Sequence, residues 1–178
     1  AELATTRAEL TGTLRIGAFP TAVRTILSPA LVALSSAHPR LELRVTELDP
    51  ALAPDALRAE TLDVALIQEY DYVPVPADPA LHSEPLFEEI VYLAARSAEP
   101  LAAHRDSAWI ASTPGTLCHT MTVRACEAAG FTPRIRHHAD DFGTVLALVA
   151  AGQGVALVPE FRTRDCPPGV TLGALPMR

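Results

Sequence analysis

The stretch that decides the fold is "LALVAAGQGVALVP", residues 146–159. Its first half places Leu146 and Val149 on one face of a helix, because residues three positions apart lie on the same side. Gly152 and Gly154 then allow a tight reversal from helix to strand, since glycine adopts backbone conformations that other residues avoid. The apolar run that follows is typical of a buried strand and ends at a proline. The stretch therefore predicts one helix–turn–strand unit of an α/β sheet.

The residues before this unit predict further helices and strands in alternation. One helix is expected to end at Gly130, because glycine commonly closes helices. Asp140 or Asp141 is expected to cap the next helix. The second half of the chain should thus contain a strand at Trp109–Ala111, a helix at Thr116–Ala129, a strand at Pro133–Ala139, a helix at Phe142–Ala151 and a strand at Val155–Val158.

The first half follows the same design. Ser28 is expected to cap a helix whose first turn holds Pro29, and His38-Pro39 should end that helix. The run "DVALI" predicts a buried parallel strand. The expected elements are a strand at Thr13–Ala18, a turn at Thr21–Leu27, a helix at Pro29–Ala37, a strand at Leu41–Leu48, a helix at Pro54–Glu60 and strands at Asp63–Ile67 and Glu88–Ala95. Two α/β lobes in series are predicted, with a cleft between them.

Phe19-Pro20-Thr21 stands where the first strand turns into a helix, and two interpretations remain open. Thr21 could cap the helix by accepting a hydrogen bond from a first-turn amide. The same amides, at the end of a parallel strand, could instead receive a ligand.

Composition limits the classes of function. A net charge of −7 with dispersed basic residues argues against nucleic-acid binding by this piece alone. No apolar run approaches the roughly 20 residues that a membrane span needs, so no membrane partner is expected. The first residues lack the pattern of a secretion signal, although a cleaved one would leave no trace. Three scattered cysteines favour a reducing compartment, and we expect a cytoplasmic location.

Several phrases, in this order, carry a family resemblance: "GTLRIGAF", "HPRLELRV", "LRAETLDVALI", "EPLFEEIVYLAAR", "AGFTPRI" and "LALVAAGQGVALVP". Together, over residues 10–178, they resemble the effector-binding domain of LysR-type transcriptional regulators. The resemblance implies a type II periplasmic-binding-protein-like fold, in which two Rossmann-like lobes are joined by two crossover strands. It also implies a small-molecule effector in the cleft between the lobes and a winged helix-turn-helix before residue 1 that contacts DNA.

The resemblance also implies a domain organisation. Residues 1–11 should be the end of a linker helix, residues 12–96 and 171–178 lobe I, and residues 97–170 lobe II. Family domains usually continue beyond the second crossover strand, so lobe I is expected to be truncated at its C-terminal part. The link "AEPLAAHRDSAW" is also shorter than is usual in the family. A homodimer or homotetramer is expected, because the first helix of this family packs on a neighbour and here carries Leu31, Val32 and Leu34.

In this family the effector lies at the first strand-to-helix turn, at the end of the third strand and at the helix starts of lobe II. Free amides and partial positive charge at helix N-termini suit an anionic or carbonyl group. By motif, the effector-binding residues implied here are Phe19, Pro20, Thr21, Gln68, Ser112, Thr113, Leu117, Cys118, Phe142 and Thr144.

Two of these positions bear on the effector's chemistry. Gln68 stands where some relatives that respond to aromatic acids carry a basic residue, and glutamine cannot neutralise a carboxylate. Pro50 stands where such relatives have a hydroxyl residue. A simple dicarboxylate is therefore not expected. Phe19 and Phe142 either line the cleft or pack in the lobes, and both interpretations remain open.

Redox, metal and catalytic chemistry find little support. Cys118 and Cys126 lie about 12 Å apart on a predicted helix, too far for a disulfide without local unfolding. His137 and His138 point to opposite faces of a strand, so no metal site is expected with the neighbouring Asp140 and Asp141.

No nucleophile elbow, HExxH, P-loop or dinucleotide fingerprint is present, and we expect neither an enzyme nor a cofactor. The alternative function is a solute-binding protein of a transporter with the same fold.

Overall fold

The computed structural model describes residues 10–74, 78–161 and 166–177. The expected linker helix at residues 1–11 lies almost wholly outside these ranges. By its internal contacts the chain forms two compact units, Ala1–Ile67 and Gln68–Arg178, here called unit 1 and unit 2. The lobe boundaries expected from the sequence are not tested by this division and stay a prediction.

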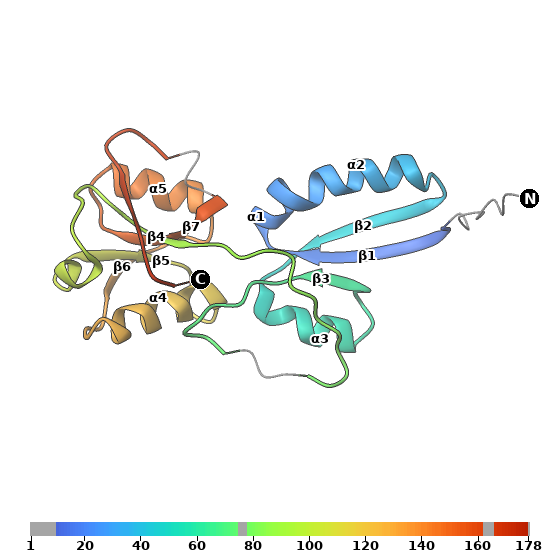
Figure 1. The fold of residues 1–178 in the computed structure, drawn as a ribbon, viewed down its shortest axis with the longest axis horizontal. Helices are drawn as coiled ribbons and strands as arrows, with labels where there is room; N and C mark the ends of the chain where they lie inside the picture. The colour runs from blue at the N-terminus through green and yellow to red at the C-terminus, as the bar shows by residue number, and fades with distance from the viewer. Residues whose placement is uncertain (1–9, 75–77, 162–165, 178) are drawn as a thin grey trace, which may run out of the picture. The chain divides into compact units, whose positions relative to one another are not determined.

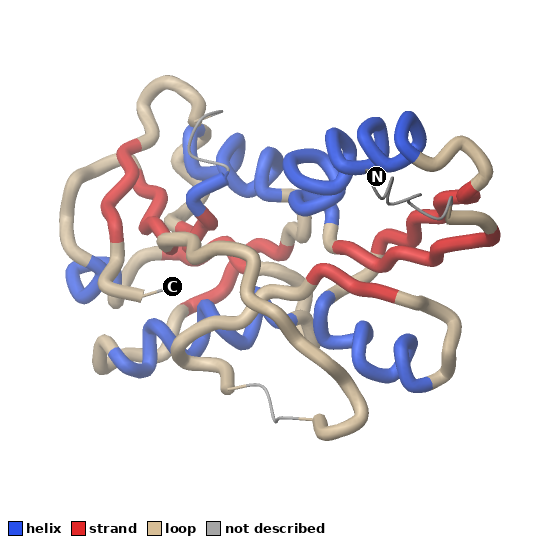
Figure 2. Tube along the Cα trace, turned by 45° about the vertical axis from the view of Figure 1, so that its right-hand side comes forward, coloured by secondary structure: helices blue, strands red, loops and turns tan. Residues whose placement is uncertain are grey.

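Unit 1 is built on a three-stranded parallel sheet in the order β2-β1-β3, with β1 at Gly12–Ala18, β2 at Leu41–Glu47 and β3 at Val64–Leu66. Ile16 of β1 lies opposite Val45 of β2 and Val64 of β3. Helix α2 (Ser28–Ala37) covers one face of this sheet and α3 (Ala53–Arg58) lies on the other, after the short helix η2 (Pro50–Leu52) (Figure 1, Figure 2).

The helix after β1 is continuous, and this corrects one prediction. α1 (Pro20–Ala22), the π-helical segment η1 (Val23–Leu27) and α2 follow one another without a break. Ser28 is helical and does not cap: its hydroxyl donates to the carbonyl of Val23 at 2.7 Å. The π-helical segment continues the helix through the position of the predicted kink, so no new N-terminus forms at Ser28.

The strand predicted at Asp63–Ile67 forms, but it is not buried. β3 pairs only with β1 among the described strands, and Val64 is 42% exposed. A strand at the edge of a sheet has one open side, whatever its apolar content. The strand predicted at Glu88–Ala95 is also shorter, because β4 begins at Val91.

Unit 2 contains a larger layered α/β structure. β5 (Ala108–Ala111) and β6 (Arg134–His138) are parallel, and β4 (Val91–Ala95) lies antiparallel between β7 (Ala156–Pro159) and β8 (Thr171–Ala174). A parallel bridge between Trp109 and Val155 joins β5 to the β7 side. Helices α4 (Leu117–Ala128) and α5 (Phe142–Ala150) lie on opposite faces of these strands (Figure 1), and the short helix η3 (Leu101–His104) precedes β5.

The core of unit 2 is divided by its strands. Trp109 faces α4 with Met121 and Cys126, whereas Ile110, the next residue, packs with Leu146 of α5. Successive residues of a strand point to opposite faces, so two neighbours on β5 serve two cores. The indole nitrogen of Trp109 donates to the His104 carbonyl at 3.1 Å.

The turn that opened the sequence analysis forms as predicted. α5 ends at Ala150, and Gly152 has a φ of 72°, a left-handed conformation that favours glycine. A Cβ at Gly154 would lie 2.5 Å from the carbonyl oxygen of Ala108. Glycine therefore lets the start of β7 approach β5 closely.

Candidate functional site

The first strand-to-helix turn of unit 1 holds three of the expected residues. Phe19 is the N-cap residue and makes no side-chain capping bond, and Pro20 opens the helix. Thr21 therefore lies inside the first turn, where it is buried at 3% exposure. Of the two interpretations of Thr21, capping is excluded, because a proline in the first helical position sets the start of the helix one residue earlier. The amides of the first turn have no acceptor within the helix.

Gln68 and Cys118, both in unit 2, are brought together by a tyrosine that the sequence analysis missed. The Tyr70 hydroxyl donates to Oε1 of Gln68 at 3.2 Å and lies 3.6 Å from Sγ of Cys118. Tyr70 itself is buried, at 7% exposure. A buried phenol needs a polar partner, so a tyrosine two residues after Gln68 was the signal in the sequence.

An acidic side chain, Glu89, lies beside Gln68. Glu89 accepts a hydrogen bond from the main-chain nitrogen of Phe161 at 2.7 Å. Burial raises the pKa of the Glu89 carboxyl above its ordinary value, and the nearby Glu160 raises it further. Hydrogen bonds from Phe161 and from Gln68 act in the opposite direction. Gln68 is thus held between a phenol and a carboxyl group.

The loop after β5 is fixed by Asp140, which the sequence analysis considered only as a cap or a metal ligand. Its two carboxylate oxygens accept from the main-chain nitrogen and from the hydroxyl of Thr113, both at 2.7 Å. Thr116 caps α4 by accepting from the His119 nitrogen at 3.2 Å, and its hydroxyl donates to the Thr113 carbonyl at 2.8 Å. Two loops that start different helices are therefore tied at Thr113.

The carbonyl of Ser112 is a shared acceptor for two histidines. Nδ1 of His119 lies 2.9 Å from it and Nδ1 of His138 lies 3.1 Å from it. A carbonyl only accepts, so each Nδ1 carries a hydrogen. Ser112 is buried, and its main chain is held in place by side chains from α4 and from β6.

The start of α5 positions Phe142 and Thr144. Asp141 is the N-cap residue and accepts from the Thr144 nitrogen at 3.0 Å, so the predicted aspartate cap is confirmed at this position. Phe142 packs in part against the core beneath α5, as Phe19 does against the core of unit 1. The contacts observed are thus with the cores, and lining of a cleft by these rings stays a prediction.

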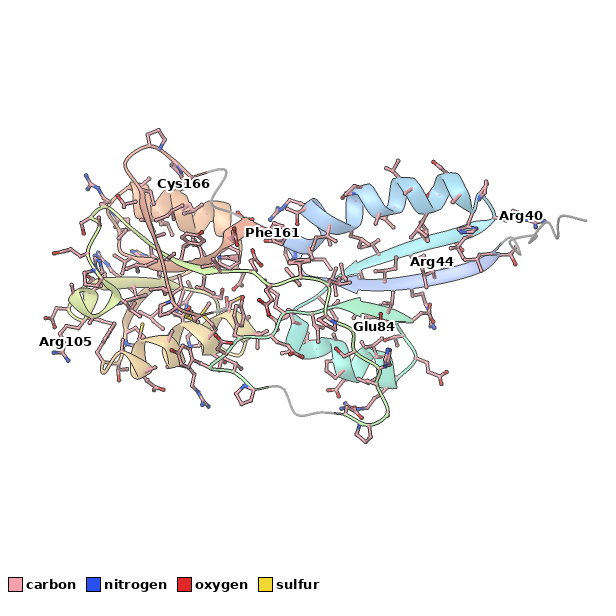
Figure 3. The ribbon with its side chains drawn as sticks, in the orientation of Figure 1. Arg40, Arg44, Glu84, Arg105, Phe161 and Cys166 are labelled. Carbon is pink, nitrogen blue, oxygen red and sulfur yellow. The ribbon has the colours of Figure 1, made fainter. Side chains whose placement is uncertain are left out.

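The three cysteines occupy different environments. Cys118 and Cys126 both lie on α4, and Cys126 is fully buried. Burial raises the pKa of the Cys126 thiol to about 12. Cys166 packs on the α5 side of the sheet (Figure 3), and burial raises the pKa of its thiol as well.

Within the described residues, no three histidine, cysteine or acidic side chains gather as a metal would require. Likewise, none of the helices in these ranges combines the length and the apolar character that crossing a bilayer demands.

The expected residues therefore form local groups. In unit 2 the loop after β5 and the start of α4 hold Ser112, Thr113, Leu117 and Cys118, while Phe19, Pro20 and Thr21 belong to unit 1. The chemistry they offer is that of hydroxyls and main-chain amides. No basic side chain is among them.

Comparisons with known proteins agree with this architecture. A family model described as the LysR substrate binding domain matches residues 7–178. The transcriptional dual regulator GltC of Bacillus subtilis is 28% identical over 171 residues, which cover 90% of this chain and 55% of that protein. The chain spans about half the length of the curated relatives it matches.

Solved structures of LysR-family regulators are also similar to this chain. A mutant of OxyR from Corynebacterium glutamicum has a TM-score of 0.71 and 28% identity, covering 94% of this chain and 54% of that one. The C-terminal domain of a probable LysR family regulator from Rhodococcus sp. RHA1 has a TM-score of 0.69 and 24% identity, covering 84% and 74%. The predicted type II periplasmic-binding-protein-like fold is thereby confirmed, and no support appears for the transporter alternative.

Proposed function

Because this chain belongs to the LysR substrate-binding domain family, we propose that it is the ligand-sensing and oligomerising part of a transcriptional regulator. In this proposal a small-molecule effector binds the residues that the family resemblance implies. Binding changes the activity of a winged helix-turn-helix in the N-terminal part of the full-length protein, and only that part contacts DNA. The net charge of −7 supports this division of labour, because a phosphate-binding surface needs concentrated positive charge.

The observation that carries the proposal is the loop held by Asp140. Hydrogen bonds at 2.7 Å fix Thr113 at the carboxyl end of β5, directly before the N-terminus of α4. Ligands of open α/β sheets bind outside the carboxyl ends of the strands, where helix amides are available. A loop that is already rigid loses little conformational entropy when a ligand arrives.

The residues implied as effector contacts favour a ligand that is polar but not strongly acidic. Ser112, Thr113 and Thr21 offer hydroxyls, and Gln68 offers an amide. Asp140 and Asp141 add negative charge nearby. A dicarboxylate would lack a cationic partner at these residues, so we propose a neutral or singly charged metabolite with hydrogen-bonding groups.

Oligomerisation, location and the absence of catalysis complete the proposal. We infer a homodimer or homotetramer in the cytoplasm, consistent with Val32, which is 70% exposed on α2. The chain binds its effector without transforming it.

The first test is a thermal-shift screen of polar metabolites on this chain. A ligand at 100 times its dissociation constant adds about 2.7 kcal/mol to the unfolding free energy, which is easily detected. A screen in which every hit is an acid that binds equally well after substitution of the implied residues would contradict the proposal.

The second test uses Thr21→Val on the hit. Thr21 does not cap the helix, so the substitution should leave the melting temperature of the free chain nearly unchanged. If the hydroxyl contacts the effector, its loss costs about 1–3 kcal/mol of affinity, because the partner group on the ligand is left unsatisfied. Thr25→Val is the matched control, because its hydroxyl donates to the Thr21 carbonyl at 2.8 Å one turn later. Equal affinities of both variants, measured by calorimetry, would remove Thr21 from the site.

A further inference from the structure

Unit 2 has an apolar pocket of about 560 Å³ that the proposed effector contacts do not use. It lies between the short helix η3, the C-terminal half of α4, and strand β8 with the residues that follow it. We propose that this pocket is a second binding site, for a small uncharged aromatic molecule. The proposal does not depend on the effector site.

The pocket has a buried floor and accessible walls. Leu93 of β4, Ala125 of α4 and Met177 form the floor, and each is at most 3% exposed. All three belong to one hydrophobic core. Tyr72 and Ala128 also line the pocket, and both are exposed to solvent. A ligand can therefore enter from solvent, and its contacts with the floor would extend this core.

Gly173 keeps the pocket open beside Leu93. The two residues are paired across β8 and β4, and opposite residues of an antiparallel pair point to the same face of the sheet. A Cβ at Gly173 would have no heavy atom within 4 Å apart from those of its chain neighbours. The space next to Leu93 is thus empty because residue 173 has no side chain.

Three alanines at the end of α4 keep another wall of the pocket short. Ala128 and Ala129 follow Ala125 by three and four positions, so all three lie on one side of the helix. Each contributes only a methyl group. The resulting volume lies within the range of about 300–1,000 Å³ that is typical of small-molecule pockets.

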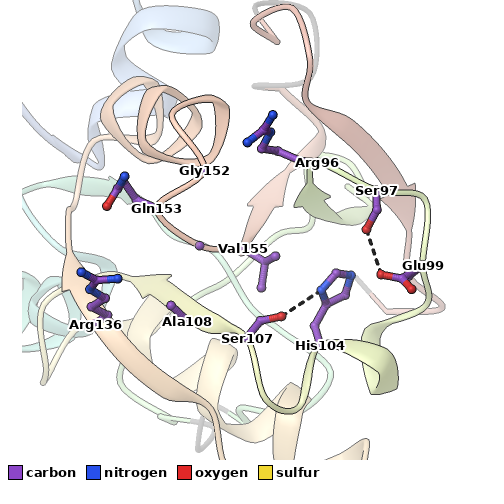
Figure 4. A pocket seen from close by; sticks show the side chains of 11 residues that line it. Arg96, Ser97, Glu99, His104, Ser107, Ala108, Arg136, Gly152, Gln153 and Val155 are labelled. Carbon is purple, nitrogen blue, oxygen red and sulfur yellow. Dashed lines mark hydrogen bonds between the residues drawn. The ribbon is translucent and has the colours of Figure 1, made fainter.

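The charges of the lining favour an uncharged ligand. Among the described residues that line the pocket, Glu99 is the only charged one. It also borders a polar cavity, where its carboxylate accepts a hydrogen bond from the Ser97 hydroxyl at 3.0 Å (Figure 4). An acidic ligand would lose water at its charge without gaining a cationic partner, which is unfavourable. A cation would gain little from a carboxylate that is exposed and already engaged.

The ring-bearing side chains of the lining favour an aromatic ligand. Tyr72, Pro100 and Pro176 line the pocket, and all three are exposed. An aromatic ligand can pack edge-to-face or offset-stacked on the Tyr72 ring, and this adds to the effect of apolar burial. The Tyr72 hydroxyl can also donate to, or accept from, one polar group of the ligand.

The test uses two fluorescent probes with the same ring system. N-phenylnaphthylamine is uncharged, whereas anilinonaphthalenesulfonate carries a sulfonate on the same skeleton. We expect saturable one-site binding of the uncharged probe by the intact chain, and at least about tenfold weaker binding of the sulfonate, equivalent to roughly 1.4 kcal/mol. Absence of binding by the uncharged probe, or equal affinities of the two probes, would overturn the proposal.

Two substitutions fill the pocket, and a matched substitution elsewhere does not. Gly173→Leu and Ala128→Leu should each weaken binding of the uncharged probe about tenfold, because the new side chain occupies its place. The control is Ala147→Leu, at an exposed position of α5 on the other face of the strands, which should bind as the parent does.

Circular dichroism shows whether each variant is folded, and the exposed position of Ala128 keeps the test valid if Gly173→Leu does not fold. Unchanged binding in the folded pocket variants would refute the site. Equal weakening in the control would also refute it, since the probe would then bind apolar surface in general.

Three further measurements distinguish other occupants and other sites. Decanol, an alkyl probe, should displace the uncharged aromatic probe only weakly, and tighter binding of decanol would overturn the aromatic ligand. Probe affinity should not depend on protein concentration, because a loss of binding on self-association would assign the pocket to a second copy of the chain. Thr21→Val should leave probe affinity unchanged, and a loss in that variant would place the probe at the effector residues.

Discussion

Hydrogen peroxide should not link Cys118 to Cys126 in the folded chain. Both residues lie on α4, eight positions apart. At 1.5 Å per residue their α-carbons are about 12 Å apart, whereas a disulfide needs about 4.4–6.8 Å. Bridging them would therefore require at least two turns of α4 to unwind, together with the core that Met121 and Cys126 form with Trp109.

The reactivity of Cys126 adds a second, chemical barrier. Its thiol has a pKa of about 12 instead of 9.0 because it is buried. A difference of about three pKa units lowers the thiolate fraction near neutral pH by about 1000-fold, and the thiolate is the nucleophile that attacks peroxide. Cys126 should thus react orders of magnitude more slowly than an exposed cysteine.

The assay is peroxide treatment under native conditions, followed by alkylation and peptide mass spectrometry without reduction. We expect Cys118, which is only partly buried, to be modified first, and Cys126 only after denaturation. Cys118→Ser and Cys126→Ser, singly and together, should leave a peroxide-independent response of the full-length protein intact. A Cys118–Cys126 disulfide that forms while the circular dichroism spectrum stays native would refute this reasoning.

Two other predictions follow from unit 1. The Asp63 carboxylate accepts from the main-chain nitrogen of Arg15 at 2.8 Å and from its guanidinium, which lowers the pKa of Asp63 from 3.8 to about 2. A carboxyl group whose pKa is lowered on folding stabilises the fold at pH values above its unfolded-state pKa, and this stabilisation is lost as the pH falls. Asp63→Asn should therefore lower the urea midpoint of unfolding at neutral pH, and the difference from the parent should shrink between about pH 4 and 2. A difference that does not depend on pH would contradict this prediction. The chain should also self-associate at tens of micromolar in light scattering. Val32→Glu should weaken the oligomer, whereas Ala30→Glu, two positions away and therefore on a different side of α2, should not. A parent chain that stays monomeric would count against the oligomer.

The local features of this chain could be predicted because their causes are local. The aspartate cap at Asp141, the Thr116 start of α4 and the glycine turn at Gly152 each depend on residues within a few positions of one another. The same holds for the alternation of helices and strands, which follows from the spacing of apolar residues. Where two local preferences compete, the sequence left the outcome open: Thr21 and Pro20 both favour a helix start, and the proline determined it.

The contacts that position the candidate site residues depend on the tertiary structure. Asp140 accepts a hydrogen bond from Thr113, 27 residues away, and Tyr70 contacts Cys118, 48 residues away. The spacing of apolar residues in the sequence cannot predict contacts over such separations. The apolar composition of β3 predicts a buried strand, but β3 is partly exposed because only β1 pairs with it among the described strands. The register shift at Arg136 exists only because β6 pairs with β5. Caps, turns and the alternation of elements are set by short-range sterics and hydrogen bonds, which the sequence by itself determines. Partners distant along the chain are set by the packing of whole elements, which only the folded chain decides.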